Sequence, residues 1–247
     1  MNSNGSWLAG VNPSCKLLAH LCVMFMLMAV SDPVITLCLW LLAVVTGIVL
    51  GGWRLGYLLK RLLPYTLFFV LIFWMLAAFG KGEHVIWQWA WFRITEESLN
   101  NGLTIGLRML GFVTYGLLFT STTDLTALMM SLIHQLRLSP KWAYGMLAGF
   151  RFIPLFQSEL QQMKAAHKIR GYKQKNSWKA FARYALPLFT QGIRKSERIA
   201  VAMEARGFTG TRNRTYYLTP VMAGKDWLYA TGLLIVAGGM IWMLGFV

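Results

Sequence analysis

Residues 62–79, LLPYTLFFVLIFWMLAAF, form a run of 18 residues without a charged side chain. A helix that crosses the hydrocarbon core of a bilayer needs about 20 predominantly apolar residues. The run is therefore typical of a transmembrane helix. The whole chain agrees, because 56% of its 247 residues are hydrophobic and only 13% are charged, about half the charged fraction of ordinary soluble domains. This composition excludes a soluble enzyme and a disordered chain.

Further apolar runs on both sides of this stretch predict more spans, at residues 17–30, 34–50, 99–120 and 227–247. The first two runs are separated only by Ser31, Asp32 and Pro33, so we expect them to form a tight helical hairpin. The first is short for a span, and Lys16 is expected to extend its side chain toward the interface. The sequence thus predicts an all-α integral membrane protein with about five transmembrane helices.

The charge is concentrated in one block, because residues 122–225 carry 17 Lys and Arg but only 4 Asp and Glu. Basic loops of membrane proteins stay on the cytoplasmic side. The block and the basic loop 51–61 are therefore expected in the cytoplasm, with the more acidic loop 80–98 outside. This places the N-terminus inside and the C-terminus outside. The predicted domains are a membrane domain, 1–121, a cytoplasmic domain, 122–225, and a final transmembrane helix, 226–247.

Motifs for covalent, metal or nucleotide chemistry are not evident in the sequence. Cys15, Cys22 and Cys38 form no CxxC pair and are interpreted as small apolar side chains. No GxxxxGK[ST] phosphate loop occurs, so a nucleotide-driven motor is expected on another chain. We expect a non-catalytic protein with no metal or cofactor, and no cleavable signal sequence.

Small and charged residues inside the spans raise two narrower questions. Glycines four residues apart are typical of close helix packing, and such pairs occur in and beside the apolar runs at Gly47 and Gly51, Gly52 and Gly56, and Gly102 and Gly106. Arg108 lies within the span 99–120. An intramembrane arginine marks either a functional site or a pairing with a backbone carbonyl or a neighbouring helix, and the sequence leaves both open.

Within the basic block, Asp124 is expected to cap a helix over 125–137, which Ser139 and Pro140 close, and a further helix is expected over 142–152. A repeated pattern then follows. The first copy begins at Pro154 and ends in Ile169-Arg170-Gly171-Tyr172, and the second begins at Pro187 and ends in Ala205-Arg206-Gly207-Phe208. Proline is favoured in the first turn of a helix and glycine just after the last. Each copy therefore predicts a helix with an arginine at its end.

The two predicted helices have matching faces. Phe156, Leu160 and Met163 form an apolar stripe on the first. The second has a row of small residues at Gly192, Ser196 and Ala200. The helices are expected to pack against each other or against the membrane surface, with Arg170 and Arg206 projecting into the cytoplasm. A guanidinium group makes bidentate bonds to carboxylate or phosphate, but an arginine there is also an ordinary helix cap.

The sequence resembles a known family at several of these positions. The segments Arg151-Phe152-Ile153-Pro154, Lys168-Ile169-Arg170-Gly171 and Ala202-Met203-Glu204-Ala205-Arg206-Gly207-Phe208, together with the Asn12-Pro13 start, are similar to the transmembrane coupling subunit of energy-coupling factor (ECF) transporters. This subunit is the T component, of the EcfT, CbiQ and BioN type. The resemblance covers most of the chain and is most specific at the 202–208 stretch.

The resemblance implies a scaffold with no catalysis of its own. It implies two long cytoplasmic coupling helices that cross, whose terminal arginines each dock into one of two ABC-type ATPase subunits. The implied docking residues are Ile169, Arg170, Gly171, Ala205, Arg206 and Gly207. Ile169 departs from the alanine that is usual in the family. The implied partners also include a membrane-embedded substrate-binding S component, which would determine the imported vitamin, vitamin precursor or metal ion.

Three alternatives to this function remain at the level of the sequence. A stand-alone channel or carrier would need ionisable groups in its spans, where Arg108 and His20 are the main ones. A membrane enzyme acting on an anionic lipid or phosphate would need paired carboxylates or a metal cluster. The basic stretch 164–183 would also suit anionic lipid or nucleic acid, although we expect no nucleic-acid partner.

Overall fold

The computed structural model describes residues 6–80, 84–89, 92–171, 178–211 and 215–245. They form two compact units, one from Met1–Ser131 with Pro220–Val247 and the other from Leu132–Thr219. We call the first the membrane bundle and the second the α6–α7 unit. The helix α5, Leu125–Gln135, crosses the boundary between them in the sequence.

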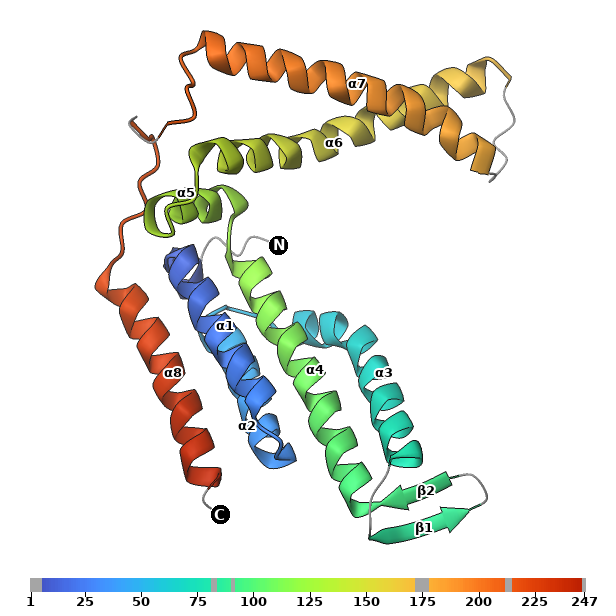
Figure 1. The fold of residues 1–247 in the computed structure, drawn as a ribbon, viewed down its shortest axis with the longest axis vertical. Coiled ribbons are helices and arrows are strands. Elements are labelled where there is room, and N and C mark those ends of the chain that lie inside the picture. The colour runs from blue at the N-terminus through green and yellow to red at the C-terminus, as the bar shows by residue number, and fades with distance from the viewer. Residues whose placement is uncertain (1–5, 81–83, 90–91, 172–177, 212–214, 246–247) are drawn as a thin grey trace. The chain divides into compact units, whose positions relative to one another are not determined.

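The membrane bundle contains five long helices that lie side by side (Figure 1). They are α1 (Pro13–Ala29), α2 (Pro33–Val49), α3 (Leu55–Phe79), α4 (Glu96–Thr122) and α8 (Gly224–Leu244), preceded by a short 3-10 helix, η1 (Trp7–Gly10). Helix α4 is central, because it packs against α1, α2 and α3. Leu27, Leu39 and Leu118 are fully buried in the shared core. The prediction of an all-α membrane protein is confirmed.

Three helices of the described residues are long and apolar enough to cross a membrane: α3, α4 and α8. Helices α1 and α2 have 17 residues each, which gives a length of about 26 Å at 1.5 Å per residue. This is a little less than the roughly 30 Å of a hydrocarbon core. Five transmembrane helices therefore remain a prediction.

The predicted tight connection between the first two apolar runs is confirmed, because only residues 30–32 join α1 to α2, but the two helices do not pack closely along each other. Helices α1 and α2 follow each other in the sequence, but each packs against α4 and α8 rather than closely along the other. Side chains of α4 occupy the break between them: Arg108 Nη2 donates a hydrogen bond to Val30 O at 2.7 Å, and Thr104 Oγ1 donates to Ser31 O at 3.1 Å. The break is thus held by a third helix.

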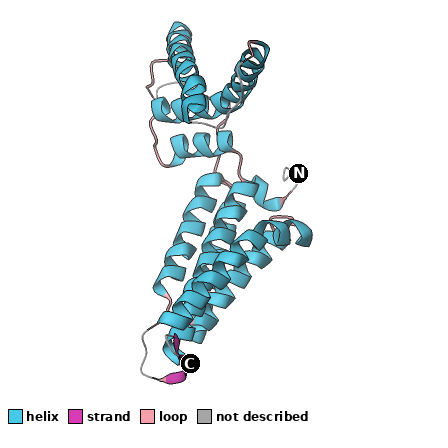
Figure 2. Ribbon diagram, turned by 90° about the vertical axis from the view of Figure 1, so that its right-hand side faces the viewer, coloured by secondary structure: helices cyan, strands magenta, loops and turns pink. Residues whose placement is uncertain are grey.

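The loops differ from the sequence-based expectations at two places. Helix α3 begins at Leu55, so Lys60 and Arg61 lie within a helix and not in a loop. The segment between α3 and α4 contains two short antiparallel strands, β1 (Val85–Trp89) and β2 (Phe92–Thr95). This hairpin lies at the end of the bundle opposite η1 (Figure 2). The N–H and C=O groups of this aromatic segment therefore pair with each other.

The α6–α7 unit contains two long helices, α6 (Pro140–Ile169) and α7 (Trp178–Ala205). The predicted helix starts at Pro154 and Pro187 are wrong, because both prolines lie inside the helices, and the separate helix expected over 142–152 is the first part of α6. The start signal of α6 is Pro140 at its first position after Ser139. An interior proline removes one backbone hydrogen bond but did not end either helix.

The cap at Asp124 is confirmed, because Asp124 Oδ2 accepts hydrogen bonds from the N–H groups of Thr126 and Ala127. The following helix, α5, ends at Gln135. Arg137 then adopts a left-handed conformation, with φ 54°, and the N–H of Leu138 donates to Leu132 O at 3.0 Å. This turn closes α5, while Ser139 and Pro140 open α6.

Candidate functional site

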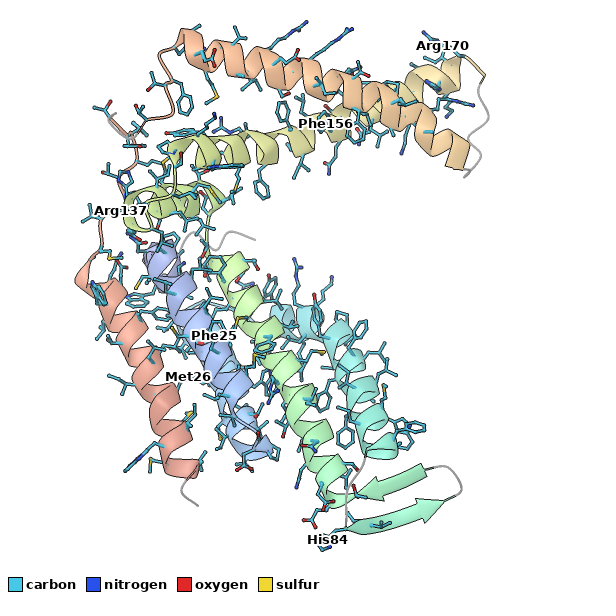
Figure 3. The ribbon with its side chains drawn as sticks, in the orientation of Figure 1. Phe25, Met26, His84, Arg137, Phe156 and Arg170 are labelled. Atoms are coloured by element: carbon cyan, nitrogen blue, oxygen red, sulfur yellow. The ribbon has the colours of Figure 1, made fainter. Side chains whose placement is uncertain are left out.

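The end of α6 presents Arg170 beyond its last turn (Figure 3). The Arg170 N–H donates to Ala166 O at 3.1 Å, and Gly171 follows with φ 75°. Left-handed backbone of this kind favours glycine because a Cβ atom would be strained there. The Arg-Gly pair therefore ends the helix and leaves the arginine side chain exposed. Ile169, beside it, is 87% exposed.

The end of α7 repeats this arrangement. The Arg206 N–H donates to Ala202 O at 3.3 Å, and Gly207 has φ 79°. The N–H of Phe208 then donates to Met203 O at 2.9 Å, as in a Schellman cap. Ala205, Arg206 and Gly207 are exposed. Two helix ends thus share one backbone geometry, each with an exposed arginine directly before a left-handed glycine.

Helices α6 and α7 approach each other closely at Gly192. A Cβ atom built on Gly192 would lie 3.0 Å from Phe156 Cζ, and Phe156 lies near the crossing of the two helices in Figure 3. The Phe156 ring stacks on that of Phe152, with centroids 5.6 Å apart. Because glycine has no side chain, the Phe156 ring can reach the α7 backbone.

Polar and aromatic contacts extend this crossing along both helices. Lys195 of α7 forms a salt bridge with Glu159 of α6, and the His167 and Tyr184 rings lie 5.2 Å apart. Leu160 and Met163 are half-buried on the same side of α6 as Phe156. The apolar stripe of α6 therefore includes the residues that face α7.

Ser196 and Ala200 lie further along α7 and are exposed, but both line a cavity of about 410 Å³. Its other walls come from the first half of α6, including Tyr144 and Phe152, and from Phe208 after α7. The Tyr144 and Phe208 rings meet edge to face, with centroids 5.5 Å apart. The small residues of α7 thus face open space on one side of the crossing.

The glycine pairs of the membrane bundle have two different roles. At Gly106 a Cβ atom would lie 2.7 Å from Phe69 Cδ2, and at Gly102 it would lie 3.1 Å from Phe73 O. These two glycines let α4 approach α3 closely, as the spacing predicts. Gly52 instead has φ 66° in a turn, and a Cβ atom built on Gly56 would meet no atom of another described segment within 4 Å. That pair makes no helix contact.

The intramembrane arginine serves as a structural clamp. Arg108 is half-buried, and it donates a hydrogen bond to Val30 O at the end of α1. His20, a second ionisable side chain in the apolar runs, pairs through Nε2 with the Tyr229 hydroxyl at 2.7 Å. Of the two sequence-based alternatives for Arg108, the pairing with a backbone carbonyl is confirmed.

Sequence reasoning missed a buried polar cluster at the η1 end of the bundle. Lys16 is fully buried, and its Nζ donates to Leu8 O and to Thr122 O at 2.9 Å each. The expectation that Lys16 reaches the interface is therefore wrong. Asp226 is 1% exposed and accepts a hydrogen bond from the Asn12 N–H at 2.9 Å. The signal was present, since a charged residue at the very start of an apolar helix can also satisfy backbone groups of its neighbours.

Within the described ranges, no group of three His, Cys, Asp or Glu side chains could hold a metal ion. The three cysteines are free thiols in α1 and α2. Parts of the basic stretch 164–183 and of the loop 80–98 lie outside the described residues, including Lys173, Lys175 and Trp91.

Comparison with known proteins gives one consistent result. The family model CbiQ, described as "Cobalt transport protein", matches residues 4–217. The chain is 27% identical to the energy-coupling factor transporter transmembrane protein EcfT of Lacticaseibacillus paracasei, covering 94% of this chain and 92% of that protein. It is 30% identical to the protein of the same name from Staphylococcus aureus, covering 81% and 79%, and 29% identical to that of Bacillus subtilis, covering 74% and 73%. The chain therefore belongs to the CbiQ family and is a transmembrane T component of the energy-coupling factor transporter class.

Proposed function

We propose that this chain is the coupling subunit of an ECF importer, in which α6 and α7 transmit the ATP-driven motion of two cytoplasmic ATPase subunits to a substrate-binding S component. The cargo would be a vitamin, a vitamin precursor or a metal ion, and the chain itself would perform no catalysis. In this proposal the protein lies in the cell membrane and residues 122–225 form its cytoplasmic coupling domain. The N-terminus is inside the cell and the C-terminus is outside.

The observation that carries the proposal is the matched pair of helix ends. Arg170 and Arg206 each precede a glycine in left-handed conformation, with φ 75° and 79°, and both arginines are exposed. Two ATPase subunits of one kind would offer two equivalent grooves, and two equivalent arginines are what such a pair requires. A carboxylate in each groove would bind the guanidinium group in a bidentate manner.

The exposed side chain of Ile169 supports the same role. Ile169 is 87% exposed at the helix end. Transfer of this apolar side chain from water into a contact with a partner would be favourable by roughly 1 kcal/mol or more. The α6 end thus offers a charged and an apolar contact side by side. The α7 end differs in this respect, since Phe208 is half-buried against Tyr144.

The crossing of α6 and α7 supports transmission between the two ends. Phe156 against Gly192 and Lys195 with Glu159 join the helices near the middle. A force applied at Arg170 or at Arg206 would therefore be shared by both helices. This is the property that a coupling element needs.

Co-purification with candidate ATPase chains tests the proposal. We expect Arg170→Ala and Arg206→Ala each to weaken the complex about tenfold or more, because removal of one partner of a buried charged pair costs about 2–5 kcal/mol. The double variant should abolish assembly and uptake. The matched control is Arg198→Ala, which removes an exposed arginine two turns before the end of α7 and should leave the complex intact.

Two results would contradict the proposal. Full assembly and transport by the double variant would show that the arginines do not dock. Substrate uptake by the chain alone in liposomes, without an ATPase, would favour the stand-alone carrier. The structural use of Arg108 and His20 in helix contacts argues against that carrier.

A further inference from the structure

The η1 end of the membrane bundle contains a polar cavity of about 360 Å³. It lies between η1, the start of α1, the end of α4 and the start of α8, and its polar lining includes Asn12, Lys16, Thr123, Asp124, Lys225 and Asp226. Its volume is within the range of sites that hold small ligands, about 300–1,000 Å³. Neither the family match nor the proposed coupling function assigns a ligand to it.

The two carboxylates of the lining already bind backbone N–H groups. Asp226 Oδ1 accepts from the Asn12 N–H at 2.9 Å, and Oδ2 accepts from the Ala223 N–H at 2.8 Å. Asp124 Oδ2 accepts from two N–H groups at the start of α5. Both acids therefore cap helix N-termini, which partly balances their negative charge.

Hydrogen-bond donors, in contrast, are left over. Asn12 is only 5% exposed, and its Nδ2 has no hydrogen-bond partner among the described residues. The orientation of this amide is fixed, because Oδ1 accepts from the Ser14 N–H at 3.1 Å and from Ser131 Oγ at 2.7 Å. Thr123 Oγ1 also has no partner in the part of the chain that the structure describes.

Two ammonium groups add to this surplus. Lys16 Nζ has three N–H donors, and the carbonyls of Leu8 and Thr122 take two of them. Lys225 is exposed, and its Nζ lies 3.2 Å from the position of a Cβ atom built on Gly10. Lys225 therefore lies over the η1 backbone, where it can bind a group in the cavity. A ligand that supplies several acceptor oxygens and negative charge fits this donor set.

We propose that the cavity binds a phosphate group and that the group belongs to a phospholipid headgroup. The apolar helix α4 ends here and α8 begins here, so the cavity is at the level where a bilayer places its phosphates. Val221, Trp227 and Leu228 are 80%, 59% and 69% exposed, and they offer an apolar surface for the acyl chains. A free anion has no apolar part that could contact this surface.

Native mass spectrometry of the full chain in detergent tests the site, with phosphatidylglycerol and inorganic phosphate added in separate series. The test variant is Thr123→Val combined with Lys225→Gln, which removes the Thr123 hydroxyl donor and the positive charge of Lys225 while keeping similar side-chain sizes. We expect its affinity for phosphatidylglycerol to fall about tenfold or more, because the phosphate loses the hydrogen bond from Thr123 and the attraction of the Lys225 charge. Lys225→Gln alone should give a smaller loss in the same direction.

The control is Arg54→Gln, which removes an exposed positive charge at the start of α3 without touching the cavity. It should bind phosphatidylglycerol as the wild-type chain does. Equal binding by the wild-type chain and by Lys225→Gln, or an equal loss in Arg54→Gln, would overturn the site. Binding of inorganic phosphate without phosphatidylglycerol would overturn the lipid as its source. The variants should still assemble with ATPase chains, which separates this proposal from the coupling function.

Discussion

The membrane bundle buries several of its polar and charged side chains, whereas the α6–α7 unit exposes most of its own. In the bundle, Lys16 and Asp226 are at most 1% exposed and bind backbone groups. In the α6–α7 unit, the ends at Arg170 and Arg206 are exposed, and the two helices meet at one crossing. The difference indicates that the bundle is a fixed frame, while the other unit has surface left for partners. Three substitutions can break or sharpen this comparison.

The largest effect is expected at Lys16. Lys16→Met keeps the length of the side chain but leaves Thr122 O without its buried donor and leaves Leu8 O with only the Val11 N–H. Since an unsatisfied buried polar group costs about 1–3 kcal/mol, we expect a loss of roughly 2–4 kcal/mol in the free energy of unfolding. Thermal unfolding in detergent measures it.

The control for this change is Lys60→Met, at an exposed position of α3, which should leave the unfolding temperature nearly unchanged. If both variants have the same unfolding temperature, the hydrogen bonds of Lys16 to Leu8 O and Thr122 O do not stabilise the bundle. The bundle would then not depend on its buried polar contacts.

A smaller effect is expected where α4 packs on α3. Gly106→Ala places a Cβ atom 2.7 Å from Phe69 Cδ2, and overpacking of this kind costs about 1–3 kcal/mol. Gly116→Ala in the same helix meets no described atom within 4 Å, so it should be neutral or slightly stabilising. Equal unfolding temperatures for the two variants would contradict the close α3–α4 approach.

The smallest effect is expected in the α6–α7 unit. Phe156→Ala removes a half-buried ring from the crossing and should cost about 1–2 kcal/mol, less than a ring in a full core. The measurement is hydrogen exchange of the α6 and α7 amides, which should speed up. Phe189→Ala removes a ring that is 73% exposed and should not change the exchange. A loss as large as that for Lys16→Met would show a more tightly packed unit than the exposure indicates.

The ends of α6 and α7 were predictable from the sequence, because an Arg-Gly pair after an apolar stripe is a local signal. Their starts were not, because Pro154 and Pro187 resemble start signals and only the continuous helices show that they are interior. The docking roles of the residues at these ends stay predictions. The sequence pattern predicted that the two helices pack either against each other or against the membrane surface. Only the structure showed that Phe156 meets Gly192.

The sequence alone determined the class of this protein, its apolar helices and the glycine caps that expose two arginines, since these depend on local hydrophobicity and backbone preferences. The tertiary structure alone decided where the buried charges go. Arg108 and Lys16 bind carbonyls of segments up to 106 residues away in the sequence, and no local pattern predicts such partners. The same holds for the donor-rich cavity, because it exists only where η1, α1, α4 and α8 meet.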